Sequence, residues 1–194
     1  MATDNKDPDL APPGAGIPTI ELWIARFIFR RFCKTHSHEE CSQLLLKHTE
    51  TMCSLAKNCS EEEGQRQVLI KRMAGLEDSS RNWSVFMTLE HVRIVNEAVA
   101  AGLPLLLEGH LPEEEANTAT VKPDMGISSE VIELLKRTNQ ELIENANQVH
   151  PHKPTTTFDH PWFGPLNAAE WLALTAFHMG LHLKQVKAIL VKLR

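Results

Sequence analysis

Apolar residues recur at helical spacing along most of this chain, and polar signatures mark where the helices begin. Residues 19–34 are apolar on nearly all sides, which is typical of a helix that packs against more than one neighbour. Ser37 and Glu40 form a capping box, a hydroxyl followed three residues later by a carboxylate. We therefore expect a second helix over residues 38–57.

The middle of the chain predicts two further helices. Ser60 and Glu63 repeat the capping box, and the apolar residues that follow predict a short helix reaching Met73. The next helix is expected from about residue 84 to residue 101, because Gly102 stands where a terminating glycine usually follows a helix.

The last part of the chain predicts two helices separated by irregular segments. Residues 103–126 contain three prolines and are predicted to form a long crossover, after which Ser128 or Ser129 caps another helix. Residues 147–164 are predicted to be a loop, and the capping box at Asn167 begins a final helix. No alternating strand pattern and no internal repeat is visible. The pattern predicts an all-α protein, a four-helix bundle with additional N-terminal helices.

Length and composition restrict the classes of function. Residues 1–17 lack periodicity and are predicted to be a disordered tail, and residues 18–194 suit one domain in which residues 18–36 form an accessory helix. A formal net charge of −5 and the absence of tyrosine argue against a nucleic-acid partner. No signal peptide is visible, and arginines interrupt the longest apolar stretch, so we expect a cytoplasmic protein that does not span a membrane.

The strongest chemical feature is a set of three histidines. His178 and His182 are one turn apart on the inward face of the final helix, where two imidazoles can reach one ion. His91 occupies an inward position in its own helix. Three neutral imidazoles would leave coordination positions open, as in catalytic zinc sites. Chance alone gives about half a pair at this spacing in a chain with ten histidines, so spacing alone is weak evidence.

Two segments that carry these histidines resemble the DinB-like superfamily. Residues 75–91 resemble the Trp-Ser…His segment of the superfamily. Residues 160–171, followed by residues 178–185, resemble its closing helix. The resemblance covers most of residues 37–194. It implies an up-down-down-up four-helix bundle, and a metal ion held by His91, His178 and His182.

The same resemblance implies an activity. Members of this superfamily include thiol-dependent transferases and a maleylpyruvate isomerase, so we expect a metal-dependent S-transferase or isomerase that acts on a small molecule with a low-molecular-weight thiol as cosubstrate. Zinc suits three imidazoles best, although nickel and cobalt also accept nitrogen ligands. Further candidate site residues are Arg81 as a carboxylate anchor, Trp83 and Trp162 as pocket walls, and Gln185 as an orienting group.

Two other functions are compatible with the sequence. The bundle could be a non-catalytic metal-binding module, with a homodimer formed through the apolar helix of residues 20–32. It could also be a hydrolase that activates water, for which Glu90 and Glu170 are the candidate bases. Residues 20–32 could contact a membrane surface, but docking on the bundle or on a second subunit is favoured.

Overall fold

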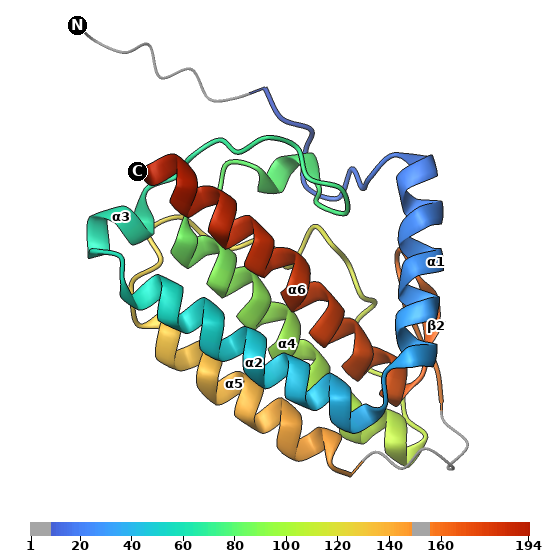
Figure 1. Ribbon diagram of the computed structural model, residues 1–194. Helices are drawn as coiled ribbons and strands as arrows, with labels where there is room; N and C mark the ends of the chain where they lie inside the picture. Colours follow the sequence, from blue (N-terminus) through green and yellow to red (C-terminus); the bar gives the residue numbers. More distant parts are fainter. Residues whose placement is uncertain (1–8, 149–155) are drawn as a thin grey trace, which may run out of the picture.

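The computed structural model describes residues 9–148 and 156–194, which form a helical bundle with a small hairpin (Figure 1). The helices, in chain order, are α1 (Thr19–Thr35), α2 (His38–Lys57), α3 (Glu61–Gln65), α4 (Val85–Glu108), α5 (Val131–Ala146) and α6 (Ala168–Leu193). A single 3₁₀ turn covers Asp78–Ser80. Strands β1 (Phe158–His160) and β2 (Gly164–Leu166) pair antiparallel, with Phe158 opposite Leu166.

Helices α2, α4, α5 and α6 form the four-helix bundle. Each of α2 and α4 packs against both α5 and α6. In Figure 1, α2 and α6 run in one direction while α4 and α5 run in the other, and the long crossover between α4 and α5 returns the chain along the bundle. The expected all-α, up-down-down-up bundle is therefore confirmed.

A buried polar network, in addition to the apolar core, fixes how the bundle helices are aligned along one another. Asn96 Nδ2 on α4 donates to Asn139 Oδ1 on α5 at 2.7 Å, and Asn139 Nδ2 donates to Thr49 Oγ1 on α2, also at 2.7 Å. All three side chains are buried. A buried amide is costly without partners, so this network favours the one register in which all three meet.

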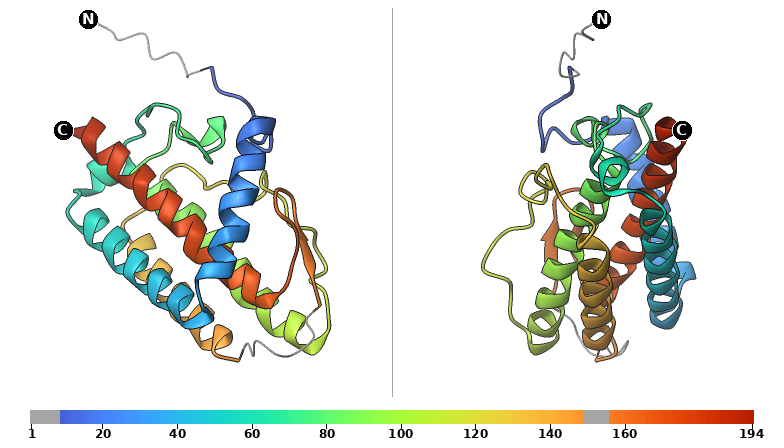
Figure 2. Two further views of the ribbon diagram at one scale, coloured as in Figure 1. Left: turned by 45° about the vertical axis from the view of Figure 1, so that its right-hand side comes forward. Right: turned by 90° about the vertical axis from the view of Figure 1, so that its left-hand side faces the viewer.

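Helix α1 crosses the N-terminal half of α6 beside the hairpin (Figure 2). Phe29 is its buried anchor, with ring centroids 4.6 Å from Phe163 and 5.6 Å from Phe177. Phe32 packs edge-on against the same Phe177 ring. One side of α1 is therefore attached to the bundle through aromatic contacts.

The predicted end of α4 is wrong, because the helix continues through Gly102 and Pro104 to Glu108. Proline has no N–H, so the carbonyl oxygen of Ala100 loses its helical partner. Asn145 Nδ2 on α5 donates to that oxygen at 2.9 Å instead. The helix ends at Gly109, whose φ of +88° is the left-handed conformation that glycine adopts readily.

The predicted helix over residues 60–73 is also shorter than expected. Helix α3 ends at Gln65, and the chain then runs extended alongside the segment that precedes α4. Val68 N donates to Trp83 O and Ile70 N donates to Arg81 O, so tertiary contacts replace helical hydrogen bonds here.

The beginning of α5 and the loop before α6 differ from expectation as well. No side chain caps α5, and Ser129 N donates to the carboxylate of Glu61. The predicted loop of residues 147–164 contributes β1 and the start of β2, while residues 149–155 lie outside the described part of the chain.

The predicted N-terminal tail is described from residue 9 onward, so its first eight residues lie outside the structure's description. Residues 9–18 contain no helix or strand, and the backbone N–H groups of Ala11 and Gly14 donate to the carboxylates of Asp78 and Glu77. Within residues 9–148 and 156–194, no helix has the length and apolarity required to cross a bilayer.

Candidate metal centre

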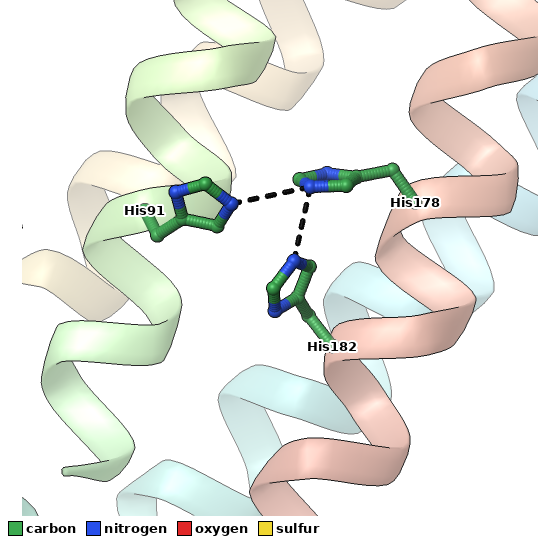
Figure 3. Close-up of side chains that lie close together, drawn as sticks. All are labelled: His91, His178 and His182. Carbon is green, nitrogen blue, oxygen red and sulfur yellow. Dashed lines mark hydrogen bonds between the residues drawn. The ribbon is translucent and has the colours of Figure 1, made fainter. Parts of the chain in front are cut away.

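The imidazoles of His91, His178 and His182 meet between α4 and α6 (Figure 3). His178 Nε2 lies 3.2 Å from His91 Nε2 and 3.0 Å from His182 Nε2. His91 and His182 are buried and His178 is half-buried. Three nitrogen atoms from two helices therefore converge on one point inside the bundle.

Local capping places these histidines. Ser84 Oγ accepts from Met87 N and starts α4 so that His91 lies about two turns into the helix. Asn167 caps α6 through a complete capping box. His178 and His182, four residues apart on α6, consequently point toward α4 from successive turns.

Hydrogen bonds to the outer ring nitrogens decide which nitrogen of each imidazole is protonated. His91 Nδ1 lies 2.6 Å from Val121 O, which can only accept, so Nδ1 donates. Gln185 Nε2 donates to Ser80 O at 2.8 Å, which leaves Gln185 Oε1 to accept from His182 Nδ1 at 2.7 Å. The Nε2 atoms of both imidazoles therefore carry lone pairs.

His178 completes a donor set that suits a divalent ion. Its Nδ1 is buried and has no partner among the described residues, so it can carry the ring proton when Nε2 acts as a ligand. Nitrogens bound tetrahedrally at 2.0–2.1 Å would be about 3.3 Å apart, close to the two observed separations. The three residues fit one ion.

Burial keeps all three imidazoles neutral. It lowers the pKa of His91 to about 4. Burial also lowers the pKa of His178 and of His182 well below the usual value, and repulsion between protonated histidines would lower it further. Neutral imidazole is the form that ligates a metal.

The three imidazoles line a cavity of about 760 Å³, with walls contributed by α1, α4, α6, the hairpin and the crossover. The apolar part of the wall includes Phe32, Trp162, Phe163 and Phe177. This volume lies in the range that holds small organic molecules. The nitrogen cluster is therefore open to a ligand-sized space.

Comparison with known proteins identifies the family and supports the fold. The sequence model of the DinB superfamily matches residues 44–186, which is well over half of the chain. The chain belongs to the DinB superfamily. A similar solved structure is described as the crystal structure of TT2238, a four-helix bundle protein; it is 26% identical, with a TM-score of 0.57, and the match covers 78% of this chain and 99% of that one. No curated protein matches the chain.

The superfamily match begins inside α2, so α1 lies outside it. Helices α4 and α5, most of α2 and α6, and all three histidines lie within it. The expected resemblance and fold are confirmed, and the cluster predicted from the sequence is present.

The structure brings three of the four predicted substrate residues to the site, in different ways. Trp162 lines the cavity. Trp83 is buried beside the imidazoles, with ring centroids 5.0 Å from His91 and 6.3 Å from His182. Gln185 is fully buried and holds His182, so its contact is with a histidine of the cluster.

Arg81 is not brought to the cavity of this DinB-superfamily protein. Its Nε donates to Ile70 O, and its Nη1 forms a 2.7 Å ion pair with Asp78. These bonds hold the extended segment after α3 against the 3₁₀ turn. The guanidinium is thus engaged in the loop.

A different cation, Lys122, lies at the cavity wall. Its Nζ donates to Glu77 Oε2 at 2.7 Å and to Ser80 Oγ at 3.1 Å, and lies 5.3 Å from the centroid of the Trp83 ring. Burial alone would raise the pKa of Glu77, but hydrogen bonds led by Lys122 lower it below the usual value. No motif in the sequence marks Lys122, because its partners are more than 40 residues away.

Proposed function

We propose that this DinB-superfamily protein binds one divalent metal ion through His91, His178 and His182 and is a metal-dependent thiol S-transferase or isomerase of a small molecule. The observation that carries the proposal is the convergence of three imidazole nitrogens on the wall of a ligand-sized cavity. Among residues 9–148 and 156–194, no fourth side chain joins the cluster. Three protein ligands with an open position characterise catalytic rather than structural zinc sites.

Zinc is the ion that we expect, because it accepts nitrogen ligands in tetrahedral geometry at the observed spacing. Nickel and cobalt also accept imidazole, and availability decides among them in many proteins. When bound, the ion would lower the pKa of a coordinated thiol and so provide a thiolate nucleophile at neutral pH.

The chain's own residues would position the reactants and exclude water. Val121 and Gln185 hold two imidazoles in the ligating tautomer. The aromatic wall would accept an apolar substrate body. Because the thiol and substrate would meet in a fixed cavity, orientation would supply part of the rate enhancement.

A hydrolase that uses a carboxylate as its general base is less well supported, because that carboxylate would have to be free and near the ion. The acidic side chains on the described cavity wall are both engaged: Glu21 with Arg72, and Glu77 with Lys122. The two bases suggested by the sequence are engaged elsewhere. Glu90 pairs with Arg93, and Glu170 caps the N-terminus of α6.

The first experiment is metal analysis of the untagged full-length protein. We expect about one divalent ion per chain, and loss of that ion in the His178→Ala/His182→Ala variant. His48→Ala is the matched control, because His48 lines the same cavity outside the cluster. A parent without metal after reconstitution with zinc, nickel or cobalt would refute the metal site.

A second experiment separates catalysis from a structural role. Cobalt-reconstituted protein titrated with low-molecular-weight thiols should develop a thiolate-to-cobalt charge-transfer band if the open position accepts the thiol. The His178→Ala/His182→Ala variant should show no such band. If cobalt binds but no thiol changes its absorption spectrum, the result would argue against the transferase and favour the non-catalytic module.

A further inference from the structure

Helix α1 presents a continuous apolar face to solvent. The face is formed by Ile20, Trp23, Ile24, Phe27 and Ile28, with exposed fractions of 78, 70, 54, 70 and 48%. Their spacing places them along one side of the helix over about two turns. We call these five residues the α1 face.

The α1 face is unusual for the surface of this molecule. Other large apolar residues that are exposed in the described ranges are spread over several different elements and loops, for example Leu69, Met125 and Val191. Isolated exposed apolar residues need no explanation, whereas a contiguous apolar patch marks an interaction site. The opposite side of α1 is already occupied, because Phe29 packs on the hairpin and α6.

We propose that a second copy of this chain packs on the α1 face, so that two α1 helices cross in a symmetric dimer. With aromatic side chains of roughly 150–250 Å² and isoleucines near the lower value, the exposed fractions amount to about 600 Å² of apolar area per chain. Two such faces would bury about 1,200 Å², which reaches the range of stable protein interfaces. Trp23 and Phe27, near the middle of the face, are the residue types that anchor interfaces.

The positions of the charges favour a protein partner over a lipid surface. Arg30, Arg31 and Lys34 are exposed at the C-terminal end of the same helix. If the two α1 helices of the dimer cross near Trp23 at the common packing angle of about 50°, their C-terminal ends lie apart. The three cations then stay hydrated at the rim of the interface. A net charge of −5 opposes approach of the whole molecule to an anionic bilayer.

The dimer would also bear on the cavity. Ile24 and Ile28 belong to the α1 face and also line the cavity that contains the three imidazoles. A partner helix along these two residues would cover that edge of the cavity. Dimerisation would therefore restrict the path by which a ligand enters from the α1 side.

Sedimentation-velocity ultracentrifugation of the full-length protein over a range of concentrations tests the dimer. We expect the parent to be a dimer, and Trp23→Glu/Phe27→Glu to raise the dimer dissociation constant by about 100-fold or more, because both anchors become charged. Met125→Glu/Val191→Glu is the matched control, since these side chains are 77 and 76% exposed on other surfaces. Circular dichroism should show unchanged helix content in both variants.

Two outcomes would overturn the proposal. One is a parent that stays monomeric at every concentration, and the other is a Trp23→Glu/Phe27→Glu variant that dimerises as strongly as the parent. Flotation with phosphatidylcholine/phosphatidylserine vesicles tests the alternative, in which the α1 face binds a lipid surface. A monomeric parent that floats, and loses flotation in the same variant, would assign the α1 face to a lipid surface.

Discussion

Replacement of Gln185 by leucine tests whether the hydrogen bonds behind the imidazoles matter for metal binding. Gln185 is fully buried and bridges His182 Nδ1 and Ser80 O with bonds of 2.7 and 2.8 Å. Leucine has a similar volume but neither an acceptor nor a donor. The change therefore removes the hydrogen bonds while largely conserving the packing.

The expected magnitudes follow from those two bonds. A hydrogen bond that orients a ligating histidine typically affects metal affinity by about 10–100-fold, which is about 1.4–2.8 kcal/mol. The metal-free protein should also lose stability, because each buried polar group left without a partner costs about 1–3 kcal/mol. We expect the Gln185→Leu variant to show both effects.

The assay is competition for metal between the metal-free protein and a chromophoric chelator, with urea unfolding measured in parallel. Gln185→Glu is the informative companion, because a carboxylate oxygen can still accept from His182 Nδ1. We expect the glutamate variant to keep near-parental affinity even where its stability falls. A folded leucine variant that binds metal as tightly as the parent would refute the argument that Gln185 positions His182.

Two further predictions concern stability and are measured by urea unfolding. Lys122→Met leaves the buried Glu77 carboxylate without its cation and should cost about 3–5 kcal/mol, whereas adding Glu77→Gln should recover much of that loss. Equal losses of stability in the single and double variants would contradict this account. Because the pKa of Glu77 is lowered in the folded protein, the ion pair stabilises the fold fully above the ordinary carboxyl pKa. This stabilisation should disappear as the pH falls through the folded-state pKa of Glu77. Asn145→Leu removes the donor to Ala100 O and should lower the free energy of unfolding by about 1–3 kcal/mol. Adding Pro104→Ala should restore stability, because residue 104 then supplies a backbone N–H to the same oxygen. No recovery would show that the carbonyl is satisfied in another way.

The parts of the fold that could be predicted from sequence are those fixed by neighbouring residues. The capping boxes at Ser37 and Asn167 are formed in the structure, and α2 and α6 start where these signatures place them. The His178 and His182 pair depends only on helical periodicity, so it too was visible. The inward position of His91 was visible in the same way, but its place beside the pair was implied only by the family resemblance, because it depends on the packing of α4 on α6.

The errors arise where distant contacts replace local ones. The helix α4 passes Pro104 because Asn145, on another helix, satisfies the freed carbonyl. The segment after α3 is extended because its backbone bonds to the segment that precedes α4: Val68 N donates to Trp83 O, and the N–H of the buried Ile70 donates to Arg81 O. Arg81 looked like a ligand anchor, yet its neighbours Asp78 and Ile70 occupy its guanidinium.

The outer hydrogen bonds of the site could not be predicted for a more general reason. Two of the groups that orient the imidazoles are the backbone carbonyls of Val121 and Ser80, in the crossover and the 3₁₀ turn. Every residue type offers a backbone carbonyl, so the identities of these residues carry no signal. The candidate metal ligands could be found from side-chain identity, whereas their orientation depends on the path of two loops. Lys122 in the crossover bonds to Glu77 and Ser80 in the other loop and so holds the two loops together. A substitution of Lys122 should therefore alter the orientation of the imidazoles, although Lys122 is not bonded to them.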